Sequence, residues 1–127
     1  MWVLHLGYVW LALGFLLLAL SGLTSLLPRT AALHALTAGA IGTMTLAVMT
    51  RASLGHTGRI LAAGPGTTTI YVLVTIAAAL RVVAPLAEEH YLAVLWLAGA
   101  AWSGAFGSFA LLYARPLMLP RETAGPV

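Results

Sequence analysis

The sequence predicts an all-α integral membrane protein, an antiparallel four-helix transmembrane bundle, and two observations carry this prediction. Of its 127 residues, 61% are hydrophobic and only 7% are charged, whereas soluble domains carry roughly a quarter charged residues. The second observation is four apolar segments, each of about 20 residues or more, which is enough for a helix to cross a hydrocarbon core of about 30 Å. The alternation of apolar and polar positions that a membrane β-barrel requires is absent.

The predicted helices cover about residues 2–27, 31–50, 67–86 and 91–113, and a tail covers 114–127. Short connections favour antiparallel neighbours, and we interpret residues 1–127 as a single membrane domain. The first segment is interpreted as a span because it is too long for a signal peptide and no Lys or Arg precedes it. Its missing basic flank is typical of a piece of a longer membrane protein, or of a late hairpin that inserts together with its neighbouring helix.

Composition narrows the chemistry. The chain has no cysteine, which excludes disulfides and thiolate metal sites, so any metal must use the four His, the four Met, carboxylates or Tyr. The net charge of +3 is small and gives nucleic-acid binding no support. The carboxylates Glu88, Glu89 and Glu122 lie in predicted loops, whereas an ion-coupled transporter usually has an acid within a helix. We identify no catalytic motif and assign no catalytic residue.

The arginines predict an orientation. With four spans, both termini lie on the same side as the connection between the second and third helices. That side would hold Arg51, Arg59, Arg115 and Arg121, and the opposite side Arg29, Arg81, Glu88 and Glu89. Because cytoplasmic loops are enriched in Lys and Arg, both termini of this multi-pass protein are expected in the cytoplasm.

The stretch from His34 to Arg59 combines an apolar helix with polar groups at both of its ends, which indicates a bound group. A rise of about 1.5 Å per residue separates His34 from His56 by much of the bilayer, so one metal cannot join them. A site within the chain would pair His5 with His56, or His34 with His90. The alternative is a ligand from another subunit or from a further part of a longer protein.

The run HALTAGAIGTMTLAVMTRASLGHTGR, with LHLGYVWLALG upstream and LRV at residues 80–82, resembles the NnrS family. These are bacterial membrane proteins that contain haem and copper and are associated with nitric oxide stress and denitrification. Family members are longer, and this chain is similar to their C-terminal third. The resemblance implies an inner-membrane location, haem b and copper as cofactors, and six characteristic positions: His5, His34, His56, Arg51, Arg59 and Arg81.

Each candidate also has a plainer interpretation. His34 would share a helical face with Ala38, Ile41, Thr45 and Val48 and is a candidate haem ligand, but an interfacial His bonded to a neighbouring helix is common. His5 and His56 are further metal-ligand candidates, although His5 also fits an aromatic belt. Arg81 lies more than a turn inside its helix, where it needs a partner or must extend to the headgroups. His34 and Arg81 should lie at similar depth, in one polar site.

The glycines around His56 predict a loop that collects backbone N–H groups around an anion, flanked by Arg51 and Arg59. A pair of haem propionates is one such anion and a lipid phosphate is another. The plainer alternative is an ordinary positive hairpin. Met44 and Met49 fall on different helical faces, so packing is favoured over a shared copper site.

Small residues repeat at every fourth position in two helices, which predicts close helix packing within the chain or in a homodimer. They are Ala35, Gly39 and Thr43, and Gly99, Ser103 and Gly107.

Three function classes remain. The favoured one is a haem-binding membrane protein, with copper as a second candidate metal, that acts in the nitric oxide response or in redox protection. The alternative is a non-catalytic packing or assembly module with interfacial histidines and no cofactor, and a third class is a small-molecule carrier. The expected partners are the lipid bilayer and a second copy or a larger membrane protein.

Overall fold

The computed structural model describes residues 2–58 and 62–119, and all regular structure in these ranges is helical. Four helical spans are long and apolar enough to cross a membrane, judged by length and composition. Their bounds are Trp2–Leu23, Arg29–His56, Pro65–Leu86 and Glu88–Met118. The prediction of an all-helical chain with four such spans is therefore confirmed.

The first span is the single helix α1 (Trp2–Leu23). The second span joins α2 (Arg29–His34), the π-helical segment η1 (Ala35–Ile41) and α3 (Gly42–His56) without a break. The third consists of α4 (Pro65–Val83) and the 3-10 turn η2 (Ala84–Leu86). The fourth begins with the 3-10 turn η3 (Glu88–His90) and continues as α5 (Tyr91–Met118).

The end of the second span differs from the prediction. The helix continues past Arg51 to His56, so Gly55 and His56 are helical and the predicted anion-cradling loop is not formed there. The helix ends where Gly58 adopts a φ of 74°, the left-handed conformation that commonly ends helices. The Gly58 N–H donates to the Gly55 carbonyl at 3.3 Å. The exposed Arg51 does not end the helix. The helix ends at the positive φ of Gly58.

The other helix ends shift by a few residues. The first helix stops at Leu23, before the predicted residue 27. The third begins with Pro65 in its first turn, where the missing N–H of proline costs nothing. The last helix runs to Met118 with Pro116 in its final turn, so the predicted tail over 114–127 begins inside a helix.

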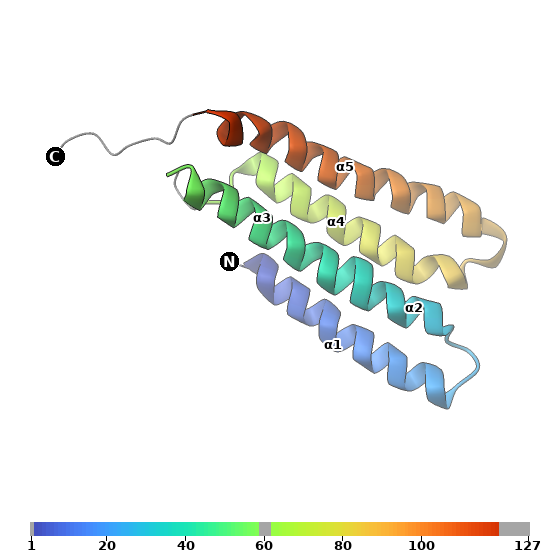
Figure 1. Cartoon of the computed structure of the whole chain (residues 1–127). Coiled ribbons are helices and arrows are strands. Elements are labelled where there is room, and N and C mark those ends of the chain that lie inside the picture. The colour runs from blue at the N-terminus through green and yellow to red at the C-terminus, as the bar shows by residue number, and fades with distance from the viewer. Residues whose placement is uncertain (1, 59–61, 120–127) are drawn as a thin grey trace.

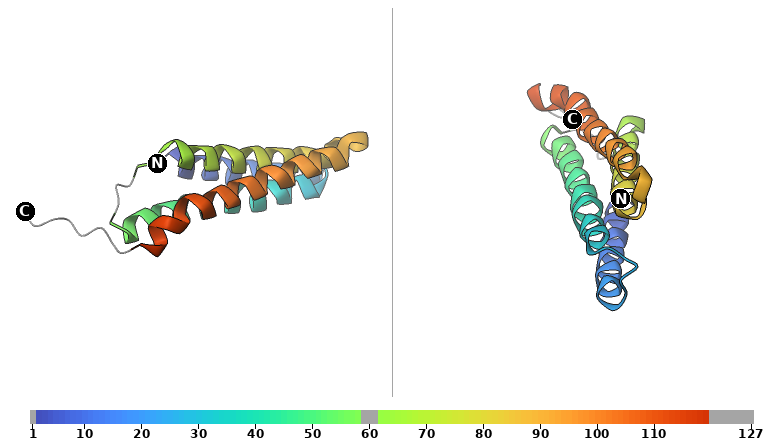
Figure 2. Two further views of the ribbon diagram at one scale, coloured as in Figure 1. Left: turned by 90° about the horizontal axis from the view of Figure 1, so that it is seen from above. Right: turned by 90° about the vertical axis from the view of Figure 1, so that its right-hand side faces the viewer.

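The spans lie side by side in chain order, and their connections alternate between the two ends of the molecule (Figure 1). α1 packs on the second span, and α5 packs chiefly on α4. The two middle spans are therefore central, with 44% and 33% of the residues in their most apolar stretches buried, against 22% and 11% in the outer spans. Figure 2 shows the resulting open arrangement, in which α1 and α5 lie apart at opposite sides.

Glycines let the spans approach closely. A Cβ added at Gly39 would lie 2.6 Å from the indole of Trp10, and one added at Gly7 would meet Met44 at the same distance. The stripe of Ala35, Gly39 and Thr43 is buried at this contact, so it packs within the chain. The stripe on α5 behaves differently, because a Cβ at Gly99 or Gly107 would meet nothing within 4 Å.

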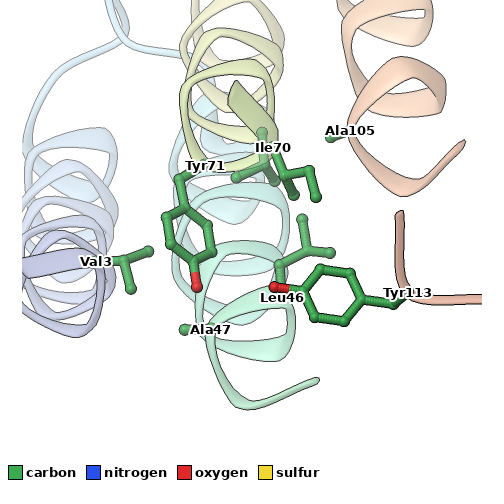
Figure 3. Packing of buried hydrophobic residues seen from close by; sticks show 8 residues of the cluster. Val3, Leu46, Ala47, Ile70, Tyr71, Ala105 and Tyr113 are labelled. Carbon is green, nitrogen blue, oxygen red and sulfur yellow. The ribbon is translucent and has the colours of Figure 1, made fainter. Parts of the chain in front are cut away.

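Two buried hydroxyl pairs tie the helices together near the N-terminal end of α4. The Thr50 and Tyr71 hydroxyls lie 2.5 Å apart, and those of Thr67 and Tyr113 lie 2.8 Å apart. Both tyrosines belong to the larger apolar core, which has Leu46 at its centre (Figure 3). The pairs join α3 to α4 and α4 to α5, which satisfies polar groups that would be costly to leave unpaired in an apolar surrounding.

Candidate functional site

His34 and Arg81 come together at one end of the molecule, as expected from their predicted depth. His34 is half-buried as the last residue of α2, and Arg81 is half-buried in the last turn of α4. Both side chains line a groove of about 590 Å³ between the second span, α4 and α5. They also line a smaller cavity of about 110 Å³ beside Tyr91 and Pro85. An imidazole and a guanidinium therefore stand between two cavities.

The groove is apolar apart from these two groups and a few hydroxyls. We call it the His34 groove, and its other lining residues are Thr37, Ala38, Ile41, Gly42, Thr45, Ala77, Ala98, Gly99, Trp102, Ser103 and Phe106. From His34 to Thr45 it extends about 16 Å along the second span, given the helical rise per residue. Its volume falls within the range typical of small-molecule and cofactor sites.

The π-helical segment decides which residues face the groove. It begins directly after His34, and π-helical turns inside α-helices are frequent at functional sites. Ala38, Ile41 and Thr45 line the groove as the sequence predicted. Val48 does not, and it lines a different groove beside His56. The prediction that Val48 shares a face with His34 was wrong, because it assumed an uninterrupted α-helix between them.

The remaining candidates lie at the opposite end. Arg51 and His56 are exposed on α3 and line a groove of about 520 Å³ against Leu4 of α1. His5, also exposed, follows Leu4 on α1, and Arg59 lies outside the described residues. Seventeen residues separate His34 from Arg51, which corresponds to about 26 Å along the span. The predicted cofactor residues therefore form two sites, and one haem cannot contact both.

The histidines do not assemble a metal centre of three ligands. Within residues 2–58 and 62–119, no three His, Cys, Asp or Glu side chains lie close enough to hold one ion. His90 is exposed in η3, beside Glu88 and Glu89. Met44 packs against Gly7 of α1, in agreement with its interpretation as a packing residue.

Sequence reasoning missed the α5 wall of the His34 groove. Trp102 lies over Gly42, where an added Cβ would meet the indole ring at 2.6 Å, and Phe106 packs against Trp102 with ring centroids 4.9 Å apart. One signal was available, because Trp102 stands next to Ser103 of the small-residue stripe. Gly99 and Ser103 of this stripe line the open groove, so the stripe does not pack closely at Gly99 within the described chain.

Comparison with known proteins gives one finding. A family model described as NnrS protein matches residues 1–121, which is nearly the whole chain. Neither the curated proteins nor the solved structures give a match.

Proposed function

Because the chain belongs to the NnrS protein family, we propose that it is a bacterial inner-membrane protein of the nitric oxide response that binds haem b in the His34 groove. Family membership supports the link to nitric oxide stress. The observation that carries the location is the meeting of His34 and Arg81 in one large apolar groove. We also propose that the four spans insert antiparallel with both termini in the cytoplasm. Arg51 and Arg115 lie at the end of the molecule where α1 begins and α5 ends (Figure 1), and cytoplasmic ends of membrane proteins are enriched in arginine.

The residues present fit a haem. His34 offers an imidazole nitrogen, the usual protein ligand of haem iron. Arg81 offers a guanidinium that can pair with a propionate carboxylate. Trp102 and Phe106 supply aromatic walls, and at Gly99 the groove is open because an added Cβ would meet nothing within 4 Å. When bound, the haem would supply an iron that takes up diatomic gases.

Each side chain then has a separate task. His34 would hold the iron at the end of the groove where α2 passes into η1. Arg81 would fix the orientation of the porphyrin by neutralising a propionate, towards the smaller cavity beside Tyr91. The apolar walls would exclude water. We assign no copper site, because the described residues do not bring together three nitrogen or carboxylate ligands.

One observation favours the alternative, a non-catalytic packing or assembly module. The α5 face with Gly99, Ser103 and Gly107 is exposed, and small residues on a membrane helix favour close approach of another helix. A second copy or a larger membrane partner would fit this face. A packing module needs no cofactor, so the visible spectrum separates the two proposals.

The test is the absorption spectrum of the protein purified in detergent from haem-replete cells. We expect a Soret band that is lost or shifted in His34→Ala. His56→Ala is the matched control, since this histidine lies on the same span about 33 Å away by helical rise, and it should keep the wild-type band. A wild type without a Soret band would contradict the proposal, as would a band lost in His56→Ala and kept in His34→Ala.

A further inference from the structure

The second groove, between α1 and α3, is separate from the proposed haem site and has a different composition. We call it the Arg51 groove, and it has a volume of about 520 Å³. Its lining residues are Leu4, Ala47, Val48, Arg51, Ala52, Gly55 and His56. Four of the seven, Leu4, Ala47, Val48 and Ala52, are apolar, and the polar groups lie towards the end of the helix.

The order of these residues along α3 gives the groove a direction. Ala47 and Val48 lie about one turn before Arg51, and His56 is the last residue of the helix. A ligand in the groove would therefore meet aliphatic walls first and a guanidinium and an imidazole at the helix end. Aliphatic walls followed by basic side chains match a lipid, whose acyl chain is followed by a phosphate headgroup.

The charges at this end favour an anionic ligand. Arg51 and His56 line the groove. The carboxylates of the described chain, Glu88 and Glu89, are both in η3 at the opposite end. Basic pockets between membrane helices are a known mode of binding anionic headgroups.

We propose that the Arg51 groove is a binding site for an anionic phospholipid, with the acyl chain against Val48 and Leu4 and the phosphate at Arg51 and His56. The lipid would seal α1 against α3 at the end where α1 begins. This site does not depend on the haem proposal, because no residue lines both grooves and Arg51 lies about 26 Å from His34 along the second span.

The test measures lipid binding by native mass spectrometry and thermal unfolding, in detergent micelles that contain phosphatidylglycerol or phosphatidylcholine. We expect bound phosphatidylglycerol and a higher melting temperature with it than with phosphatidylcholine. Arg51→Gln should lower the affinity for phosphatidylglycerol about fivefold, the effect of one basic residue at an anionic surface. Arg115→Gln is the matched control, an arginine at the same end outside the groove, and should retain the wild-type binding.

A second variant keeps the charges. Ala52 is exposed on the groove wall, so Ala52→Trp should fill the groove, abolish selective binding and leave the helix content unchanged by circular dichroism. The proposal is overturned if both groove variants bind phosphatidylglycerol as the wild type does, or if Arg115→Gln loses it equally. Stabilisation by inorganic phosphate alone, dependent on Arg51, would identify a free anion as the ligand and would also overturn it.

Discussion

The hydroxyl of Tyr71 on α4 lies 2.5 Å from the hydroxyl of Thr50 on α3, and both side chains are buried. The Thr50 hydroxyl also lies 3.1 Å from the carbonyl of Ala47, and either hydroxyl of the Thr50–Tyr71 pair can be the donor. The ring of Tyr71 also meets Trp2 of α1 edge to face, with centroids 5.7 Å apart. Tyr71 thus links three spans at one depth.

Removing this hydrogen bond should weaken the contact between α3 and α4. Tyr71→Phe keeps the ring and its contact with Trp2, and we expect a loss of unfolding free energy of about 0.6 kcal/mol, with an upper bound of about 1.7. Unfolding by SDS in mixed micelles measures it. Thr69→Val is the control, because the hydroxyl of Thr69 is exposed and donates to the carbonyl of Pro65 in its own helix. Equal losses in both variants would contradict a specific interhelical bond.

Two glycines should respond oppositely to alanine. Gly39→Ala would place a Cβ 2.6 Å from the ring of Trp10, and overpacking of a buried contact costs about 1–3 kcal/mol. Gly99→Ala meets nothing within 4 Å and should stabilise the helix by up to about 1 kcal/mol. The same SDS titration compares them. A destabilised Gly99→Ala would instead indicate that another helix covers the α5 stripe.

Arg81 should affect haem retention without being an iron ligand. Arg81→Gln removes the partner of a propionate, and the loss of a charged hydrogen bond predicts a fall in haem affinity of about tenfold or more. The position of the Soret band should stay unchanged, because the iron ligand is still present. Haem titration of the apoprotein measures the affinity. Arg115→Gln, an arginine far from the groove, should match the wild type, and an equal fall there would argue against a specific role for Arg81.

The end of α3 depends on one backbone conformation. Gly58 has a φ of 74°, and a left-handed conformation costs other residues about 1–2 kcal/mol. Gly58→Ala should therefore destabilise the second span by about this amount. Gly64→Ala in the same connection is the control, because its φ of −73° suits any residue and an added Cβ has open space. Indistinguishable melting curves for the two variants would refute this explanation of the helix end.

The four spans could be predicted from the sequence, because the length of each apolar segment is enough to identify them. The sequence also placed His34 and Arg81 at one depth, since helical rise converts residue number into position. Two features of the candidate site could not be predicted without the three-dimensional structure. The wider turns of η1 rotate Val48 away from His34, and no local sequence pattern predicts a π-helical segment. The wall formed by Trp102 depends on how α5 packs on its neighbours, which hydrophobic periodicity does not determine.

The most direct test of the haem site is rescue of His34→Ala by free imidazole. The variant is reconstituted with haem, and imidazole is added while the Soret band is followed, with His56→Ala treated in parallel. If His34 holds the iron, imidazole should restore the wild-type spectrum in His34→Ala at concentrations that leave His56→Ala unchanged. A wild-type spectrum in His34→Ala before any imidazole is added would contradict the assignment of His34 as the haem ligand.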